Sequence, residues 1–166
     1  AEKVEVLDKK NLRKFVKQLQ KTMTKNQEDR AKYGDEPEKF MESEVDLDEA
    51  IIRLKALSAS PELYQEFVTI EGLSMIVQLL NHENPDIVLD CIDLLDDLTD
   101  PPIFREFPLA LDPFLSVLSG SEFVVSLIQN IKQFDAIASA HQQRLKDGKE
   151  GKKEGNNHQD KDNREG

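Results

Sequence analysis

The residues best placed to do chemistry are four aspartates that recur at one period in the middle of the chain. They stand at i, i+4, i+7 and i+11, as Asp86, Asp90, Asp93 and Asp97. This is the spacing of side chains on one face of an α-helix. Like charges at this spacing cost about 0.2–0.5 kcal/mol per pair. Two interpretations remain open: a merely solvated helix face, or a surface that binds a basic ligand.

No catalytic or metal-binding pattern surrounds this row. A carboxylate pair such as Asp93 and Asp97 can do acid–base work, but no motif supports it here. Gly72 and Gly120 stand alone, outside any phosphate-binding loop. The single cysteine and the three histidines, Cys91, His82, His141 and His158, show no ligand spacing. We predict no catalytic residue, no metal and no cofactor, with Cys91 buried and His82 exposed in a loop.

The charge of the chain is strongly uneven. The net charge is −11 at pH 7, and residues 48–145 hold 5 basic and 16 acidic residues. Such a surface repels nucleic acid and favours basic partners. We therefore predict no direct binding of nucleic acid, while a charge that only keeps the protein in solution is the alternative.

The apolar spacing predicts a series of helices. The first covers residues 8–32, with Asp8 as its N-cap, apolar residues on one face and seven basic residues on the other. We expect it to pack on the end of the domain rather than on a membrane, because its apolar stripe has few large residues. Ser60-Pro61-Glu62 and Asn84-Pro85-Asp86 are helix-start signals, in which Ser60 and Asn84 are the expected N-caps and a proline and an acidic residue follow. Asp100-Pro101-Pro102 ends a helix.

The middle of the chain repeats itself at an offset of 41 residues. Equivalent positions keep their type, as in Ala50 with Cys91, Leu54 with Leu95, and Leu73 with Phe114. A period near 41 with two or three helices per unit is typical of armadillo and HEAT repeats. The sequence therefore predicts an all-α, armadillo/HEAT-like α-α superhelix, a short right-handed solenoid whose neighbouring units bury each other's apolar faces.

This pattern divides the chain into three parts. We predict an N-terminal helical capping segment over residues 1–45 and armadillo-like repeats over residues 46–145. The last part, residues 146–166, is composed of Gly, Lys, Glu, Asp, Asn and a few similar residues. We predict that it is a disordered charged tail, because it has almost no apolar surface to bury.

Several segments together resemble the β-catenin-like protein 1 family. They are Lys25-Asn26-Gln27-Glu28 with Arg30, then Pro37–Glu44 followed by Asp46-Leu47, then Leu79-Leu80 with His82-Glu83-Asn84, Asp93-Leu94-Leu95 and Leu98-Thr99-Asp100, and finally Val124-Val125 with Leu127, Gln129 and Asn130. The match covers about residues 6–135. Pro37–Asp46 is its most specific part, because helical periodicity alone does not produce a polar stretch of that length.

The resemblance implies a nuclear armadillo-like protein that is associated with the spliceosome and pre-mRNA splicing. It also implies recognition of basic, nuclear-localisation-type segments of splicing-factor proteins. In armadillo proteins the third helix of each repeat lines the groove, which would place the aspartate row there, together with Glu49 at the position equivalent to Asp90. The alternatives are a cytosolic armadillo-type co-chaperone or adaptor, and an enzyme with a pocket of convergent polar groups.

Overall fold

The computed structural model describes residues 7–120, 123–136 and 139. Every regular element in these ranges is helical, so the prediction of an all-α, armadillo-like fold is confirmed. The α-helices are α1 (Lys9–Tyr33), α2 (Met41–Leu54), α3 (Tyr64–Thr69), α4 (Gly72–Leu79), α5 (Pro85–Leu98), α6 (Pro101–Glu106) and α7 (Leu111–Leu118). Short 3₁₀ helices are η1 (Pro37–Lys39), η2 (Lys55–Ala59), η3 (Pro61–Leu63) and η4 (Pro108–Ala110).

The chain forms two compact units, Ala1–Ser126 and Leu127–Gly166. The first unit contains α1 to α7 and both surfaces discussed below. The second is described at residues 127–136 and 139, which are helical. The predicted tail, residues 146–166, lies outside the described residues. The other two predicted parts, residues 1–45 and 46–145, stay predictions.

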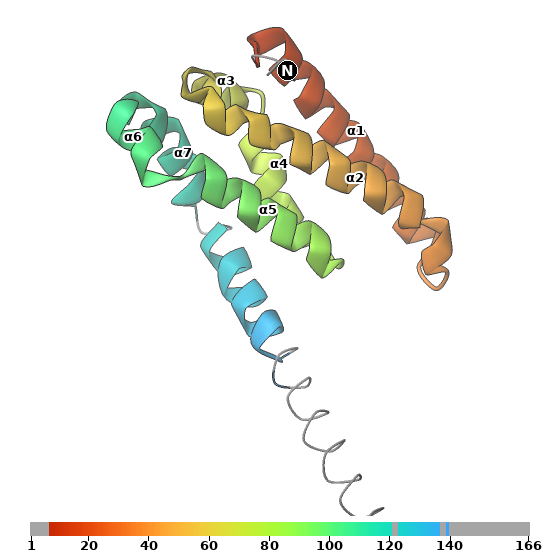
Figure 1. Cartoon of the computed structure of the whole chain (residues 1–166). Coiled ribbons are helices and arrows are strands. Elements are labelled where there is room, and N and C mark those ends of the chain that lie inside the picture. The colour runs from red at the N-terminus through yellow and green to blue at the C-terminus, as the bar shows by residue number, and fades with distance from the viewer. Residues whose placement is uncertain (1–6, 121–122, 137–138, 140–166) are drawn as a thin grey trace, which may run out of the picture. The chain divides into compact units, whose positions relative to one another are not determined.

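α1 and α2 form an antiparallel pair that lies side by side in Figure 1. As predicted, Asp8 caps α1, because its Oδ1 accepts a hydrogen bond from the backbone N–H of Asn11 at 2.6 Å. The face of α1 toward the protein carries Leu12, Val16 and Leu19, which are buried. Its exposed face carries the lysines. α1 therefore packs on the protein through its apolar face, while its covering of the domain end stays a prediction.

Gly72 lets α3 and α4 pack closely where the chain turns. Glu71 has a positive φ of 64°, and α4 begins at the next residue. A Cβ atom at Gly72 would lie 2.1 Å from Cε2 of Phe67, which is completely buried. Only glycine therefore fits between the two helices without movement of the Phe67 ring.

α5 lies beside α2 in Figure 1, and equivalent positions of the repeat are buried on the two helices. Asn84 caps it as predicted, because its side-chain oxygen accepts a hydrogen bond from the backbone N–H of Asp86. Members of three pairs at the 41-residue offset are buried on both helices: Leu47 with Val88, Ala50 with Cys91, and Leu54 with Leu95. The prediction for Cys91 is confirmed, and its burial raises the pKa of the thiol.

Two local predictions are wrong. Ser60 makes no capping hydrogen bond, since it is buried and precedes a 3₁₀ turn, η3, before α3 begins at Tyr64. Its backbone takes φ −137° and ψ 63°, which is not the usual extended conformation of an N-cap residue. His82 is only partly exposed, because Asn26 of α1 covers one edge of its ring.

Among the described residues, no single helix is long and apolar enough to cross a membrane, although one bent pair, Pro108–Leu118 with Phe123–Ala136, passes on length and composition alone.

Candidate functional site

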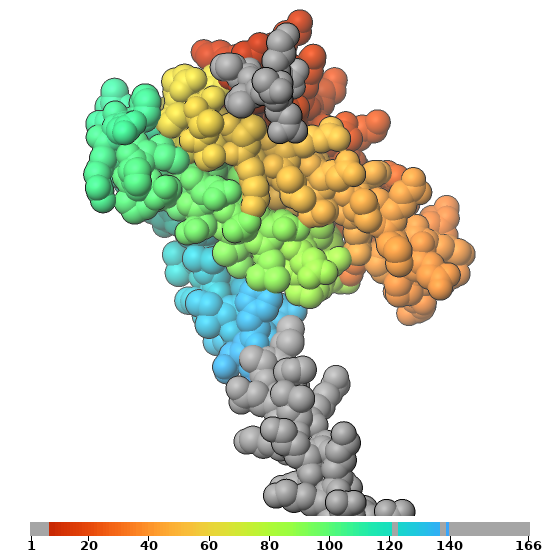
Figure 2. Space-filling view, viewed as in Figure 1, coloured from red at the N-terminus to blue at the C-terminus, as the bar shows by residue number. Residues whose placement is uncertain are grey.

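The aspartate row predicted from the sequence lies along α5, on the side opposite its buried residues. Asp86, Asp93 and Asp97 are exposed, whereas Asp90 is half-buried against α2. The outer surfaces of α2 and α5 adjoin on one face of the unit, which is turned toward the viewer in Figure 2. We call this surface the α2/α5 face and define it by the aspartate row and the residues of α2 and η2 that border it.

Lys55 of η2 contacts two aspartates of the row. Its Nζ forms an ion pair with Asp93 Oδ2 and lies 3.8 Å from Oδ2 of Asp97. The hydrogen bond to Asp93 raises the pKa of Lys55, so the ammonium stays charged. A lysine of the chain itself therefore occupies the C-terminal end of the row and compensates part of the repulsion between its carboxylates.

Asp90 has a different neighbour, Asp48 of α2. Partial burial raises the pKa of Asp90 to about 6, and a hydrogen bond to Asp48 and the charge of that residue add to the effect. Asp90 is therefore half protonated at about pH 6 and mostly charged at neutral pH. It is the least available member of the row for a cation, because it is half-buried against α2.

Glu49, the remaining predicted residue, is exposed on α2 and pairs with Arg53 one turn later, at 3.3 Å. The structure thus places all five predicted residues on α2 and α5, which lie side by side, but three of them form ion pairs within the chain and a fourth, Asp90, is hydrogen-bonded to Asp48. Asp86 forms no ion pair among the described residues.

Exposed apolar side chains border the row. Met41, Val45 and Ile52 of α2 and Leu89 of α5 are between 47% and 57% exposed. On α2, Met41, Val45, Asp48 and Ile52 follow the same i, i+4, i+7, i+11 spacing as the aspartates do on α5. The α2/α5 face therefore combines an acidic row with aliphatic surface, which suits the ammonium or guanidinium head and the apolar stem of Lys and Arg.

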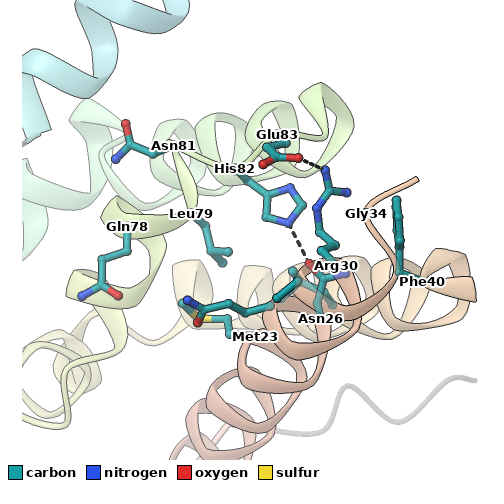
Figure 3. Close-up of a pocket in the computed structure, with 13 residues that line it drawn as sticks. Met23, Asn26, Arg30, Gly34, Phe40, Gln78, Leu79, Asn81, His82 and Glu83 are labelled. Carbon is teal, nitrogen blue, oxygen red and sulfur yellow. Dashed lines mark hydrogen bonds and ion pairs between the residues drawn. The ribbon is translucent and has the colours of Figure 1, made fainter. Parts of the chain in front are cut away.

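A second feature is a cavity of about 560 Å³ between the C-terminal half of α1 and the loop before α5 (Figure 3). Its walls include Met23, Asn26, Arg30, Leu79 and His82. Sequence periodicity did not indicate this site. The only signal for it was that Lys25–Arg30 and His82–Asn84 both belong to the segments that resemble one family.

Hydrogen bonds run through the floor of this cavity in one direction. The backbone N–H of Asn84 donates to Nδ1 of His82, so Nε2 carries the proton and donates to Oδ1 of Asn26 at 2.9 Å. Asn26 Nδ2 then donates to Ser43 Oγ, and the Ser43 hydroxyl donates to the Phe40 carbonyl. Burial, and then the charge of Arg30, lower the pKa of His82, which fits a neutral ring.

Arg30 lines the same cavity, and its guanidinium group has several partners. Its guanidinium pairs with Glu44 of α2 and with Glu83 of the loop, and it lies 4.6 Å from the centre of the Phe40 ring. Figure 3 shows the Arg30–Glu83 ion pair and the His82–Asn26 hydrogen bond, both of which join α1 to the loop. Because the polar side chains that line this cavity bind one another, they hold α1, α2 and the start of α5 together. It offers little for catalysis.

Neither feature provides a metal site, since no group of three or more His, Cys, Asp or Glu side chains that could hold an ion occurs among the described residues. The α2/α5 face remains the strongest candidate binding surface. It is acidic, it is open and part of its charge has no partner.

Comparison with known proteins identifies what this chain resembles. A family model described as catenin-beta-like, Arm-motif containing nuclear matches residues 1–147. β-Catenin-like protein 1 of Homo sapiens is 34% identical over 129 residues, covering 78% of this chain and 23% of that protein. The β-catenin-like protein 1 homolog of Schizosaccharomyces pombe is 39% identical over 124 residues, covering 75% of this chain and 22% of that protein.

These matches confirm the resemblance described above, and they cover most of this chain. The chain spans less than a quarter of the length of these relatives.

Proposed function

This chain belongs to the catenin-beta-like family of Arm-motif-containing nuclear proteins, and on that premise we propose that it is a non-catalytic interaction scaffold of the nucleus. Its task is to bind basic, nuclear-localisation-type segments of splicing-factor proteins, in association with the spliceosome and pre-mRNA splicing. The family description as nuclear supports this compartment over the cytosol.

The α2/α5 face is the observation that carries the proposal. Asp86, Asp93 and Asp97 expose their carboxylates in a row on α5. Their summed charge attracts a cationic segment before contact. Lys55, lying between Asp93 and Asp97, shows that a primary ammonium group fits in this row.

The apolar border supplies the remaining affinity. Exposed ion pairs contribute about 0.2–1 kcal/mol each, so the row alone supports only weak binding. Met41, Val45, Ile52 and Leu89 are exposed beside it and can bury against the stems of lysine and arginine side chains. Together the two contributions suit an affinity in the micromolar range, about −8 kcal/mol.

The experiment that tests this function is an affinity pull-down from nuclear extract, with the captured proteins identified by mass. The wild type and an Asp86→Asn/Asp93→Asn variant serve as the two baits. We expect splicing proteins that contain Lys/Arg-rich segments on the wild type and a reduced amount on the variant. Capture of the same proteins by both baits moves the binding site off the α2/α5 face, and absence of splicing proteins from the wild type contradicts the function.

A further inference from the structure

A second charged surface, of opposite sign, lies on the outer face of α1. Lys10, Lys14, Lys17 and Lys21 follow one another at i, i+4, i+7 and i+11, and all four are exposed. At a rise of about 1.5 Å per residue this row is about 16 Å long. We call these four residues the lysine row.

The lysine row has no partner within the described part of the chain. Each of its members is absent from the ion pairs there, whereas two other basic residues of α1 are paired: Arg13 with Glu66 of α3 at 2.6 Å and Lys25 with Asp46 of α2 at 3.3 Å. α1 therefore pairs some of its basic residues with neighbouring helices and leaves the lysine row charged.

The lysine row is unfavourable for the stability of α1 itself. Like charges one turn apart repel, and basic residues near a helix N-terminus oppose the macrodipole. α1 begins with Lys9 and Lys10 and has no acidic residue in its first turn. Asp8 offsets the cost at the N-terminus, because its carboxylate caps the helix there, but the ion pairs of the described residues leave the repulsion between the four lysines uncompensated. Such a row is typical of a surface kept for a partner.

The surroundings exclude a lipid surface. The apolar face of α1, with Leu12, Val16 and Leu19, is buried in the protein and cannot enter a membrane. None of the large hydrophobic side chains exposed in the described residues belongs to α1. An interfacial helix needs such residues beside its basic face.

They also disfavour a nucleic acid strand. Toward the C-terminus of α1 the lysine row is followed by Glu28, which lies on the same face seven residues after Lys21. The protein as a whole carries a net charge of −11. A long polyanion that followed the row would soon lie over acidic surface, and α1 exposes no aromatic ring on which a base could stack.

From the isolated basic row and its acidic boundary, we propose that the outer face of α1 is a docking surface for a short acidic segment of a partner protein. Glutamates or aspartates at i, i+4, i+7 and i+11 of a partner helix have the same rise as the lysine row and meet it along its length. This inference is independent of the proposed function, because it uses the opposite charge and a different helix.

A titration with a labelled acidic peptide tests the proposal. The peptide carries four glutamates at helical spacing, and a scrambled peptide of the same composition spreads them around the helix. The protein variants are Lys14→Gln/Lys17→Gln and the matched control Lys39→Gln/Lys132→Gln, which removes the same charge from exposed positions elsewhere. Glutamine keeps helix propensity, so circular dichroism should show both variants folded.

We expect the ordered peptide to bind the wild type and the control equally and the Lys14/Lys17 variant about 2- to 30-fold more weakly. Its affinity should fall as salt rises, and it should exceed that of the scrambled peptide. Equal losses in both variants, no binding to the wild type, or tighter binding of a single-stranded oligonucleotide or an anionic vesicle through Lys14 and Lys17 would each overturn the proposal.

Discussion

His82 Nε2 lies 2.9 Å from Asn26 Oδ1, a contact between residues 56 positions apart that holds the loop before α5 on α1. The other ring nitrogen accepts from the backbone N–H of Asn84. A doubly protonated ring has no acceptor to offer Asn84. The hydrogen bond from Asn84 therefore depends on a neutral imidazole, whereas a protonated ring can still donate to Asn26.

We predict that His82→Gln lowers the free energy of unfolding by about 1 kcal/mol at neutral pH, and that this difference shrinks as the pH falls. The folded-state pKa of His82 is lowered from 6.5. Below that value the unfolded chain takes up a proton that the folded protein resists, so the wild type loses stability on acidification. Urea unfolding of both proteins across this range measures the effect. A difference that stays constant with pH would contradict it.

The protonation of Asp90 has the opposite effect on stability to the protonation of His82. Its pKa is raised from 3.8 to about 6 in the folded protein, so its stabilising effect is present at low pH and lost as the pH rises through about 6. We predict that Asp90→Asn stabilises the protein by about 0.5 kcal/mol above this pH and has little effect well below it. Asp86→Asn, on the same row but away from Asp48, is the control and should not stabilise. Thermal melts at two pH values decide between these outcomes.

The sequence predicted what depends on neighbours along the chain. The caps Asp8 and Asn84 and the burial of Ala50 with Cys91 follow from local spacing and from one repeat period. The pairs Lys55–Asp93 and Asp48–Asp90 could not be predicted in this way. They depend on the position of α2 relative to α5 along the helix axes, which no helical period encodes.

Long-range contacts also explain the failures. His82 stands in a polar loop, which predicts exposure, and only the fold brings Asn26 against it. Ser60 precedes a proline, which predicts a cap, but burial of Pro61 and Leu63 favours a 3₁₀ turn there. In both cases tertiary packing outweighs a local preference.

Gly72 gives a test of the fold itself. A methyl group there would lie 2.1 Å from Cε2 of the buried Phe67 ring, which would have to move. We predict that Gly72→Ala costs about 1–3 kcal/mol of unfolding free energy. Gly34→Ala is the control, since its Cβ would lie 3.4 Å from the nearest atom, the carbonyl oxygen of Arg30. Equal stability of the two variants in urea would contradict the packing of α3 on α4.

Lys55 competes with a basic ligand for the aspartate row. We predict that Lys55→Met raises the affinity for a Lys/Arg-rich peptide by about 2- to 5-fold, because it frees Asp93 and Asp97 while keeping an apolar stem over them. Lys17→Met, which removes the same charge from an exposed position on α1, is the control for net charge. Calorimetric titration of the three proteins gives the comparison, and an unchanged or weakened affinity for Lys55→Met would show that Lys55 does not occupy the binding position.

One titration tests the claim that the α2/α5 face binds basic segments. A fluorescent localisation-type peptide is added to the wild type, to Asp86→Asn/Asp93→Asn, and to Asp35→Asn/Asp112→Asn, in which two exposed aspartates outside the face are neutralised. We predict binding that weakens with salt and about a 2- to 30-fold loss only in the Asp86/Asp93 variant. Equal affinity in all three proteins, or affinity independent of salt, would contradict the claim.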